Sequence, residues 1–283
     1  MTGRRVLRFS AEGLTLVGDG YGDPAAPPVL LLHGGGQTRH AWGGTAAALA
    51  QAGWYAIALD LRGHGESSWD PAGDYSIEAF ARDLVAVAAG FTRTPAVVGA
   101  SLGGLALLIA QGEMAARPAA AAVLVDIAPR TDPVGVERII RFMSAHPEGF
   151  ASLDDAADAI ARYLPDRPRP RDLSGLSKNL RRGPDGRWRW HWDPRFLRSE
   201  RRPTVTQDPE RLEAAARNLR VPTLLVRGRM SDVVSAASVQ AFLAQVPDAR
   251  FVDVCGAGHM VAGDRNDAFT EAVVAFLAEH HPA

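Results

Sequence analysis

A serine flanked by glycines, at residues 97–108 (VVGASLGGLALL), has the residue types of a covalent nucleophile. Residues 99–103 (GASLG) match the pattern G-x-S-x-G, which places a serine on a sharp turn between a strand and a helix. The run PAVVGA before it is short and Val-rich, which predicts a buried strand, and LGGLALLIAQG after it has helical spacing. We therefore expect the Ser101 hydroxyl to stand exposed at a strand-to-helix turn.

Serine is a weak nucleophile near neutral pH and needs a base, which a third group must hold in place. His259, in VCGAGHM after the last predicted strand, is a candidate for this base. The other histidines belong to Gly-rich loops, lack a matching partner in the sequence, or, as His280 and His281, are expected to form a frayed tail. The pair of Ser101 and His259 predicts acyl-transfer chemistry.

Buried-strand runs and amphipathic helices alternate along most of the chain, which predicts a mostly parallel sheet flanked by helices in an α/β fold. Residues 131–219 differ, because they contain helical, basic and aromatic segments but no buried-strand run. We expect residues 1–130 and 220–283 to form one α/β core and residues 131–219 to form a mainly helical insertion after the sixth strand.

Six segments appear in the order LLHGGG, DLRGHGES, VVGASLGG, VLVDIAP, LLVRGRMSD and GAGHM, each at the end of a predicted strand. On these segments the chain resembles the α/β-hydrolase fold superfamily, in its branch of serine hydrolases and esterases that carry a cap domain. The resemblance spans nearly the whole chain. It implies that the inserted segment is the cap and that His259 is the catalytic histidine.

The resemblance leaves two candidates for the acid of a Ser-His-Asp triad. Asp232, in LLVRGRMSD, follows the seventh strand at the usual place of the family, although one residue later after the strand glycine than the commonest spacing. Asp126, in VLVDIAP after the sixth strand, is an alternative location known in relatives, and its other role would be to tie the loop by hydrogen bonds. Asp232 is the preferred acid.

The glycine-rich segment HGGGQ can present backbone N–H groups to a developing oxyanion. The resemblance implies that the donors are the N–H groups of Gly35 and Leu102, and that residues 60–65 support the loop. A phosphate-binding loop is a poor alternative, because neither a P-loop lysine pattern nor a dinucleotide fingerprint accompanies the glycines.

The cap segment RWRWHW alternates indoles with polar residues, so a short strand would place three indoles on one face, after a hairpin signal at residues 185–186. We expect these indoles mainly to pack the cap. Trp42, Phe142 and Met143 are expected to line the substrate pocket.

Composition excludes several other classes of partner. The net charge is −1 with 22% charged residues, which does not suggest nucleic acid. No run of about 18 apolar residues predicts a membrane span, no secretory signal opens the chain, and the one cysteine, Cys255, has no second cysteine to pair with. We expect a cytoplasmic protein without metal or cofactor; the oligomeric state is not predicted.

The function expected from these residues is hydrolysis of carboxylic esters of small, largely apolar substrates through an acyl-enzyme. A lactonase, a carbon–carbon bond hydrolase and a cofactor-free perhydrolase would use the same triad. Epoxide hydrolases and haloalkane dehalogenases carry an aspartate at the turn, so Ser101 argues against both. An alternative of another class is a receptor of this fold that holds a small molecule without converting it.

Overall fold

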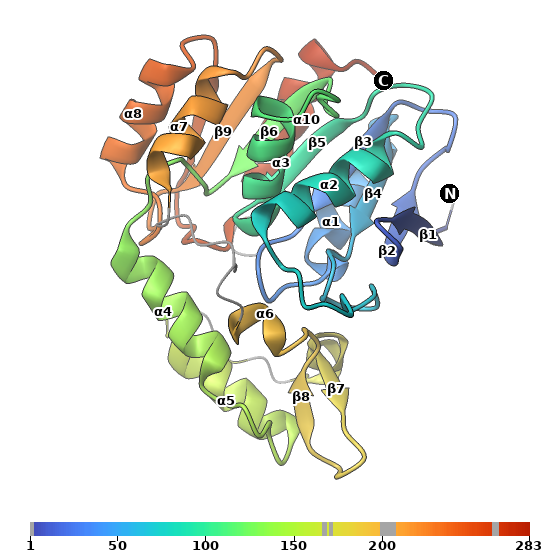
Figure 1. The fold of residues 1–283 in the computed structure, drawn as a ribbon, viewed down its shortest axis with the longest axis vertical. Coiled ribbons are helices and arrows are strands. Elements are labelled where there is room, and N and C mark those ends of the chain that lie inside the picture. The colour runs from blue at the N-terminus through green and yellow to red at the C-terminus, as the bar shows by residue number, and fades with distance from the viewer. Residues whose placement is uncertain (1–2, 166–168, 170–171, 199–207, 262–265) are drawn as a thin grey trace.

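A central eight-stranded sheet organises the computed structural model, which describes all residues except 1–2, 166–168, 170–171, 199–207 and 262–265 (Figure 1). The strand order is β1-β2-β4-β3-β5-β6-β9-β10. β1 and β2 pair antiparallel, β2 pairs antiparallel with β4, and the remaining pairs are parallel. The strands are β1 (Arg5–Ala11), β2 (Leu14–Tyr21), β3 (Pro28–Leu32), β4 (Tyr55–Leu59), β5 (Ala96–Ala100), β6 (Ala121–Val125), β9 (Thr223–Gly228) and β10 (Arg250–Val254).

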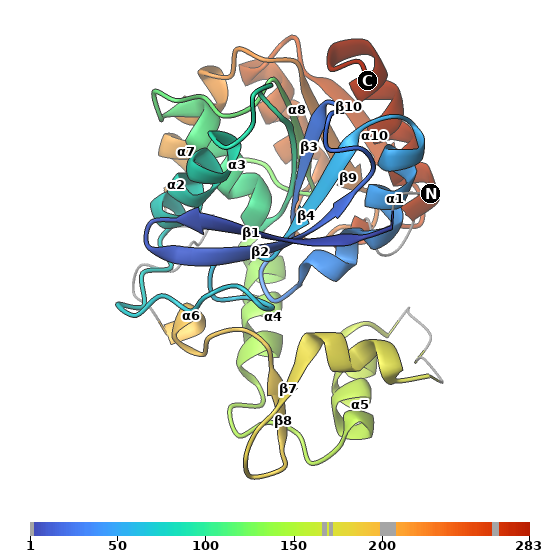
Figure 2. The ribbon, with the colours of Figure 1, turned by 90° about the vertical axis from the view of Figure 1, so that its right-hand side faces the viewer.

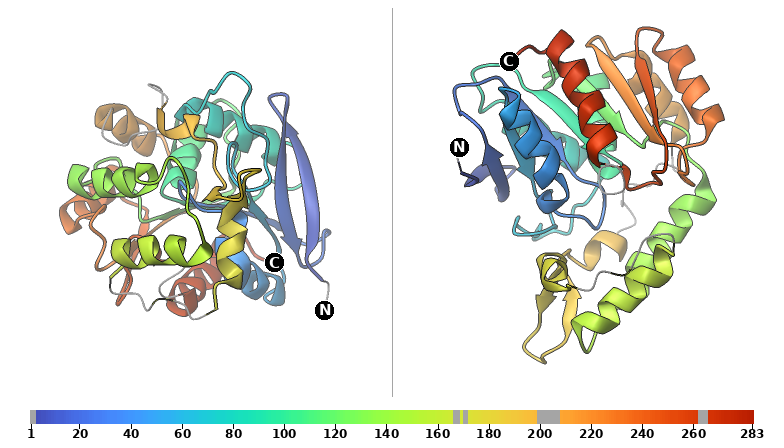
Figure 3. Two further views of the ribbon diagram at one scale, coloured as in Figure 1. Left: turned by 90° about the horizontal axis from the view of Figure 1, so that it is seen from below. Right: turned by 180° about the vertical axis from the view of Figure 1, so that it is seen from behind.

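Helices cover both faces of the sheet because the central strands are apolar on both faces. In β3, Leu30 and Leu32 join one core cluster while Val29 and Leu31 join the other, as the alternation of a strand requires. The first cluster includes residues of α2 (Ile77–Ala88), α3 (Leu102–Gly112), α7 (Pro209–Arg217) and α8 (Ala236–Gln245). The second includes residues of α1 (Gly43–Gln51) and α10 (Asn266–His280), which lie in front in the rear view of Figure 3. The predicted α/β fold is confirmed.

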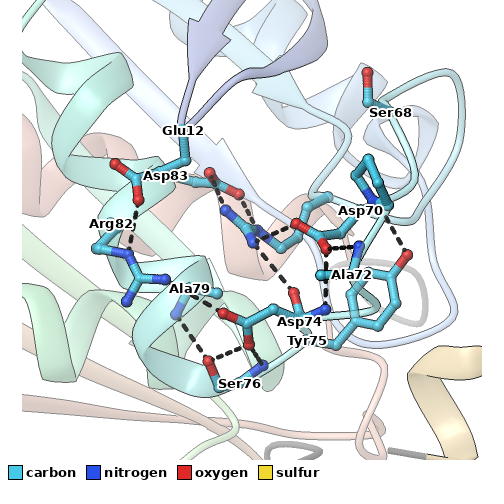
Figure 4. A network of polar contacts seen from close by, with 12 residues as sticks. Glu12, Ser68, Asp70, Ala72, Asp74, Tyr75, Ser76, Ala79, Arg82 and Asp83 are labelled. Atoms are coloured by element: carbon cyan, nitrogen blue, oxygen red, sulfur yellow. Dashed lines mark hydrogen bonds and ion pairs between the residues drawn. The ribbon is translucent and has the colours of Figure 1, made fainter.

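A polar network fastens the loop between β4 and α2 (Figure 4). Inside it, the buried guanidinium of Arg62 donates to both carboxylate oxygens of Asp83, at 2.6 and 2.7 Å. Arg82 reaches Glu12 at 3.0 Å, and the Ser76 hydroxyl accepts the N–H of Ala79 at 3.3 Å as the cap of α2. Through Arg62, this network ties the segment 60–65 to α2.

The segment between β6 and α7 extends away from the sheet below the carboxyl ends of its parallel strands (Figures 1 and 2). It contains α4 (Pro133–Ser144), α5 (Leu153–Tyr163), the short helix η2 (Ser174–Asn179), the hairpin of β7 (Leu180–Arg182) and β8 (Trp188–Trp190), and α6 (Arg195–Arg198). We call this segment, residues 133–198, the cap. α7, which falls within the predicted insertion, instead packs on α3, where Gly112 leaves no room for a side chain beside Ala215.

The C-terminal helix α10 ends in a fixed contact and not in the frayed tail expected from the sequence. His281 is 4% exposed, its N–H donates to Leu277 O at 2.7 Å, and its carbonyl oxygen accepts the indole N–H of Trp54 at 2.8 Å. Burial of the adjacent apolar face of α10 brings the tail against the core. Among the helices in the described residues, none has the length and apolar character needed to cross a membrane.

Candidate active site

Ser101 lies at the sharp turn between β5 and α3 in a strained backbone conformation. Its φ of 46° and ψ of −110° are rarely adopted by a residue with a side chain. The N–H of Ser101 donates to Val125 O at 3.0 Å, which ties the turn to β6. The turn is tight enough that a Cβ added to Gly99 would lie 2.5 Å from Gly103 O, and one added to Gly103 would lie 2.5 Å from Leu32 O. The glycines of the G-x-S-x-G pattern therefore permit the close approach that presents Ser101.

His259, in the loop after β10, contacts the carboxylate of Asp126. Its Nδ1 lies 2.7 Å from Asp126 Oδ2, and the histidine side chain is 16% exposed whereas that of Asp126 is 1% exposed. A carboxylate can only accept from a neutral imidazole, so Nδ1 carries the proton and Nε2 is left as the basic nitrogen. His259 and Ser101 line the same cavity, with Asp126 buried behind the imidazole.

The carboxylate of Asp126 is held from several sides. Oδ1 accepts the N–H of Gly228 at 3.0 Å, and Oδ2 accepts the hydroxyl of Ser231 at 2.5 Å in addition to the imidazole. The Asp126 backbone also has a positive φ of 48°, and its N–H donates to Val226 O at 2.7 Å. These contacts fix the Asp126 carboxylate between the ends of β6 and β9 and the imidazole of His259.

Ser231 has its hydroxyl proton committed to Asp126. Its Oγ accepts two backbone N–H groups, from Val233 and Val234, each at 3.1 Å. A serine hydroxyl has two acceptor lone pairs and one proton, so the proton points to Asp126 Oδ2. Ser231 occupies the position at which the commonest spacing after the strand glycine would place an acid, and it supports an acid that comes from the neighbouring strand.

Asp232 lies elsewhere, and the expectation that it holds His259 is corrected by the geometry. Its Oδ2 pairs with Arg138 of α4 at 2.9 Å, and the two side chains are 35% and 52% exposed. The extra residue after the strand is the physical reason: Ser231 takes the inward place in the turn, and the backbone of Asp232 packs against Gly135 at the start of α4. The structure brings Asp126, the alternative acid, to the imidazole.

The glycine-rich loop of residues 33–37, which the sequence predicts to hold the oxyanion and which we call the oxyanion loop, lies directly over the serine. A Cβ added to Gly34 would lie 3.3 Å from Ser101 Cβ. The N–H of Gly34 donates to Gln37 Oε1 at 3.0 Å and the N–H of Gly36 donates to His64 Nε2 at 3.1 Å. Between them, within the part of the chain that the structure describes, the N–H of Gly35 donates no hydrogen bond.

On the serine side of the site, too, an N–H group without a partner among the described residues lies between two that are hydrogen-bonded. The N–H of Ser101 is bonded to Val125 O, and the N–H of Gly103 donates to His33 O at 3.2 Å. Leu102 is the first residue of α3, so its N–H has no partner within the helix. The two predicted donors, the N–H groups of Gly35 and Leu102, are thus the ones left available among bonded neighbours, and both residues line the cavity.

Three buried imidazoles clamp the oxyanion loop. His33 Nε2 accepts the N–H of Leu61 at 3.0 Å, and His64 Nε2 accepts that of Gly36. His191, from the cap, accepts the N–H of Gly65 at 2.7 Å with Nδ1 and approaches Gly36 O at 3.2 Å with Nε2. Gly36 is therefore held through both its N–H and its carbonyl oxygen.

These three imidazoles must be neutral to accept N–H groups. Burial lowers the pKa of His33 from 6.5 to about 4 and that of His64 to about 3. Burial also lowers the pKa of His191 well below 6.5, and neighbouring His64 lowers it further. The arrangement supports the expectation that residues 60–65 serve as scaffold, and it adds a cap residue to that scaffold.

A cavity of about 560 Å³ lies between the sheet edge and the cap. Ser101, His259 and the oxyanion loop line its base. The three residues expected in the pocket, Trp42, Phe142 and Met143, all line it. Further lining side chains come mainly from the cap and are apolar or aromatic: Val136, Ile139, Ile140, Ile160, Tyr163, Leu164, Leu176, Trp190, Trp192, Phe196 and Leu197.

Four aromatic rings form one continuous wall of this cavity. Trp192 lies against Gly36 and stacks on Trp190, with ring centroids 5.0 Å apart and planes within 12°. Trp190 meets the edge of Phe142 at 5.6 Å, and Phe142 stacks on Tyr163 at 4.1 Å. We call these four residues the aromatic wall; it runs from the oxyanion loop to α5. Trp190 and Trp192 therefore line the pocket besides packing the cap.

Sequence reasoning did not identify Ser231 or His191 as parts of the site. A signal for Ser231 was present, because the one-residue offset of Asp232 leaves a serine at the commonest acid position. His191 gave no such signal, since a histidine between two tryptophans of a cap hairpin resembles a solvated residue; its burial comes from packing on the core loop, where it is 2% exposed.

Comparison with known proteins agrees with this architecture. A family model described as the alpha/beta hydrolase family matches residues 29–272. The esterase Rv0045c of Mycobacterium tuberculosis is 31% identical over 256 residues, covering 88% of this chain and 82% of its own. A 3-hydroxybutyrate-oligomer hydrolase of Cupriavidus necator is 29% identical over 253 residues, with 84% and 85% covered.

Solved structures of similar proteins superimpose on nearly the whole chain. E-2-(acetamidomethylene)succinate hydrolase gives a TM-score of 0.85 at 23% identity, covering 97% of this chain and 99% of its own, a likeness of fold. The crystal structure of esterase Rv0045c gives a TM-score of 0.75 at 29% identity, with 98% and 92% covered. Both likenesses extend through the cap.

Proposed function

Because the chain belongs to the alpha/beta hydrolase family and its relatives include an esterase, we propose that it hydrolyses carboxylic esters through an acyl-enzyme on Ser101. The observation that carries the proposal is the hydrogen-bonded series of Ser231, Asp126 and His259, which ends at an imidazole that lines the same cavity as Ser101. In this proposal Asp126 is the acid of the triad, in place of Asp232.

The first step is attack of Ser101 Oγ on the ester carbonyl. His259 Nε2 takes the hydroxyl proton as the tetrahedral intermediate forms, and returns it to the alkoxide that leaves. Asp126, whose Oδ2 lies 2.7 Å from His259 Nδ1, accepts the Nδ1 proton, fixes the orientation of the ring and stabilises the imidazolium. Water, deprotonated by the same Nε2, then attacks the acyl-enzyme and releases the acid.

The negative charge on the intermediate is met by the N–H groups of Gly35 and Leu102. Each such donor is worth about 3 kcal/mol in a transition state when it is fixed beforehand. The fixation is supported by the contacts on either side, in which His64 and His191 hold Gly36 and the close packing of Gly103 holds the first turn of α3. The donors therefore need no rearrangement as charge develops.

The cavity favours small, largely apolar substrates. Its volume of about 560 Å³ fits a drug-sized molecule, and most of its lining is aliphatic or aromatic. The acyl or alcohol chain would lie along the aromatic wall, beside Trp192 and Trp190. One relative is named an esterase and the other a 3-hydroxybutyrate-oligomer hydrolase, names that support hydrolysis in general.

The test is turnover of p-nitrophenyl esters of graded acyl length by wild type and Ser101→Ala. The proposal expects saturable hydrolysis by the wild type and loss of turnover to the uncatalysed rate in the variant, because no other hydroxyl stands at the turn. Stoichiometric labelling by a fluorophosphonate, located at Ser101 by peptide mass spectrometry, supplies a second readout that does not depend on the choice of ester.

A matched control is Ser68→Ala. Ser68 lies in the loop after β4, outside the cavity, and its hydroxyl accepts only the N–H of Thr15. Wild-type turnover in this control, with no turnover in Ser101→Ala, assigns the nucleophile. Substantial turnover in Ser101→Ala would remove Ser101 from the mechanism. Tight binding of small esters by a wild type that neither turns over nor labels would support the receptor alternative instead.

A further inference from the structure

Lys178, in η2 of the cap, is the single lysine of the chain among 31 Lys and Arg residues, and it lines the cavity. Its side chain is exposed, and no salt bridge involves its ammonium group among the described residues. Many of the arginines, by contrast, pair with carboxylates, as Arg62 does with Asp83 and Arg211 with Glu113. Among the residues that the structure describes, Lys178 is thus a cation without an ion-pair partner, and it lies where a ligand in the cavity can reach it.

The rest of the cavity wall makes this cation stand out. The described lining residues include no Asp, Glu or Arg, so Lys178 is the only permanently charged group among them. His40, which also lines the cavity, has its pKa lowered by burial and by nearby Arg39, and therefore adds no second cation near neutral pH. A lone charge in a cavity with apolar walls focuses its field on whatever the cavity holds.

The main chain that carries Lys178 is anchored to the catalytic core. The next residue, Asn179, accepts the hydroxyl of Thr38 through Oδ1 at 3.1 Å and the N–H of His191 through its carbonyl oxygen at 3.2 Å. Thr38 follows the oxyanion loop directly, so the position of Lys178 is set relative to the oxyanion donors. The main chain at Lys178 is fixed, whereas its four-carbon side chain is flexible. Such a lysine can pair with one anionic group of a ligand.

A second donor in the same wall is unpaired. Trp190, in the aromatic wall, has an indole Nε1 that is buried and has no hydrogen-bond partner among the described residues. A buried N–H without an acceptor is costly unless a ligand supplies one. The buried indole Nε1 of Trp42, which also lines the cavity, has no partner either among the described residues. All three groups are donors, and none can bind a cation.

We propose that the natural substrate of this site is an ester that carries a free carboxylate remote from the scissile bond, and that the carboxylate pairs with the ammonium group of Lys178. The apolar chain between the two groups lies along the aromatic wall. A monoanion matches one cation, whereas a phosphate group would call for several cations or an Arg fork, which the lining lacks. This inference rests on the proposed function, since it concerns the substrate of the same site.

The experiment compares two matched series of aryl esters. The anionic series consists of the mono-p-nitrophenyl esters of succinate, glutarate and adipate, and in the neutral series an isopropyl group replaces the free carboxylate. The measured quantity is the ratio of kcat/KM for the anionic ester to that for the neutral ester. Ser101→Ala serves as the blank, because a neighbouring carboxylate accelerates the spontaneous hydrolysis of such esters.

The variants are Lys178→Met, which removes the charge but keeps the length of the stem, and Lys178→Arg, which retains the charge. We expect Lys178→Met to lower the ratio by about fivefold to tenfold at the preferred chain length, and Lys178→Arg to lower it by less. Raising the salt concentration should lower the wild-type ratio and leave that of Lys178→Met nearly constant.

Arg5→Met is the matched control for net charge, because Arg5 is exposed on β1 at the far edge of the sheet. A ratio that falls equally in Arg5→Met and Lys178→Met, or does not change in Lys178→Met, would overturn the inference. In either case, neutral esters cleaved by the wild type but not by Ser101→Ala would leave the proposed function intact. Absence of cleavage of both the anionic and the neutral esters would count against the proposed function itself.

Discussion

Two neighbouring strands, β6 and β9, are each followed by an aspartate, and the two aspartates have opposite environments. Asp126 after β6 is fully buried and accepts from Gly228, Ser231 and His259. Asp232 after β9 is about one-third exposed and faces Arg138 of the cap. Burying a carboxylate is costly unless hydrogen-bond donors compensate for the lost water. The number and the direction of these donors therefore distinguish Asp126, which can hold an imidazole, from Asp232 near the surface.

The largest effect is expected from Asp126→Asn. An amide keeps the shape but can donate to Nδ1, which favours the wrong tautomer of His259, so kcat for a neutral aryl ester should fall by on the order of 10³ to 10⁴-fold. The thermal midpoint and the fluorescence spectrum show whether the fold is retained. If Asp126→Asn keeps more than a tenth of the wild-type kcat while folded, Asp126 is not the acid of the triad.

Burial distinguishes some histidines from the others, as it distinguishes the two aspartates. The lowered pKa of the buried histidines leads to a prediction about stability and pH. Burial holds the pKa of His33 at about 4 and that of His64 at about 3 in the fold, below the ordinary value of 6.5. The unfolded chain therefore takes up protons from pH 6.5 downward while the folded chain does not. Stability is complete above about pH 6.5 and is lost as the pH falls towards 4, by up to about 1.4 kcal/mol per pH unit for each histidine.

Urea unfolding between pH 8 and pH 4.5 measures this loss, above the range in which most carboxylates titrate. His191→Gln, which keeps a group able to accept and donate, provides the internal comparison, since it removes one of the buried titrating groups. Its free energy of unfolding should fall less steeply with pH than that of the wild type. Equal slopes for the two proteins would show that His191 is not held neutral in the fold.

An effect of intermediate size is expected from Ser231→Ala. Loss of the hydroxyl leaves Asp126 Oδ2 with one fewer donor and leaves the N–H groups of Val233 and Val234 without an acceptor. The carboxylate is then less firmly fixed, so we expect kcat to fall by about tenfold, in line with a charge-assisted hydrogen bond of about 1.5–3 kcal/mol.

Ser231→Thr retains the hydroxyl and should recover most of this loss, whereas a purely steric role for Ser231 would make the larger threonine the worse variant. An unchanged kcat in Ser231→Ala would mean that the short contact with Asp126 has no role in catalysis.

The smallest effect is expected from Asp232→Asn. Its ion pair with Arg138 is partly exposed and screened by solvent, and such pairs contribute about 0–1 kcal/mol to stability. Activity on a neutral ester should stay within about twofold of wild type, because the residue does not reach the imidazole. A hundredfold loss of kcat in folded Asp232→Asn would reverse the comparison and restore the assignment favoured by the sequence alone.

Features set by local sequence could be predicted, and features set by tertiary packing could not. The apolar runs identify the parallel strands, and the glycines at 99 and 103 identify the turn at Ser101, because both depend on a few neighbouring residues. The choice between Asp126 and Asp232 depends on which way a turn points after two different strands. Asp232 lies one residue later than the commonest spacing, and this single residue decides which aspartate reaches His259. The sequence shows the extra residue but does not show which way the side chains after it point.

The cap, α7 and the C-terminal residues show the same limit. The hairpin of the cap and the pocket positions of Phe142 and Met143 were predictable from turn chemistry and apolar residue type, and both residues line the cavity. The packing of α7 on α3, the burial of His281 and the reach of His191 to Gly36 depend on contacts between residues more than 70 positions apart or on the fit of one helix against another. Such contacts leave no periodic trace in the sequence.

The rate at which a fluorophosphonate labels Ser101 tests most directly the claim that Asp126 activates the nucleophile through His259. The measurement compares wild type, Asp126→Asn and Asp232→Asn at one probe concentration and needs no assumption about the natural substrate. The account predicts slow labelling in Asp126→Asn and the wild-type rate in Asp232→Asn. Slow labelling in Asp232→Asn with a wild-type rate in Asp126→Asn would contradict it.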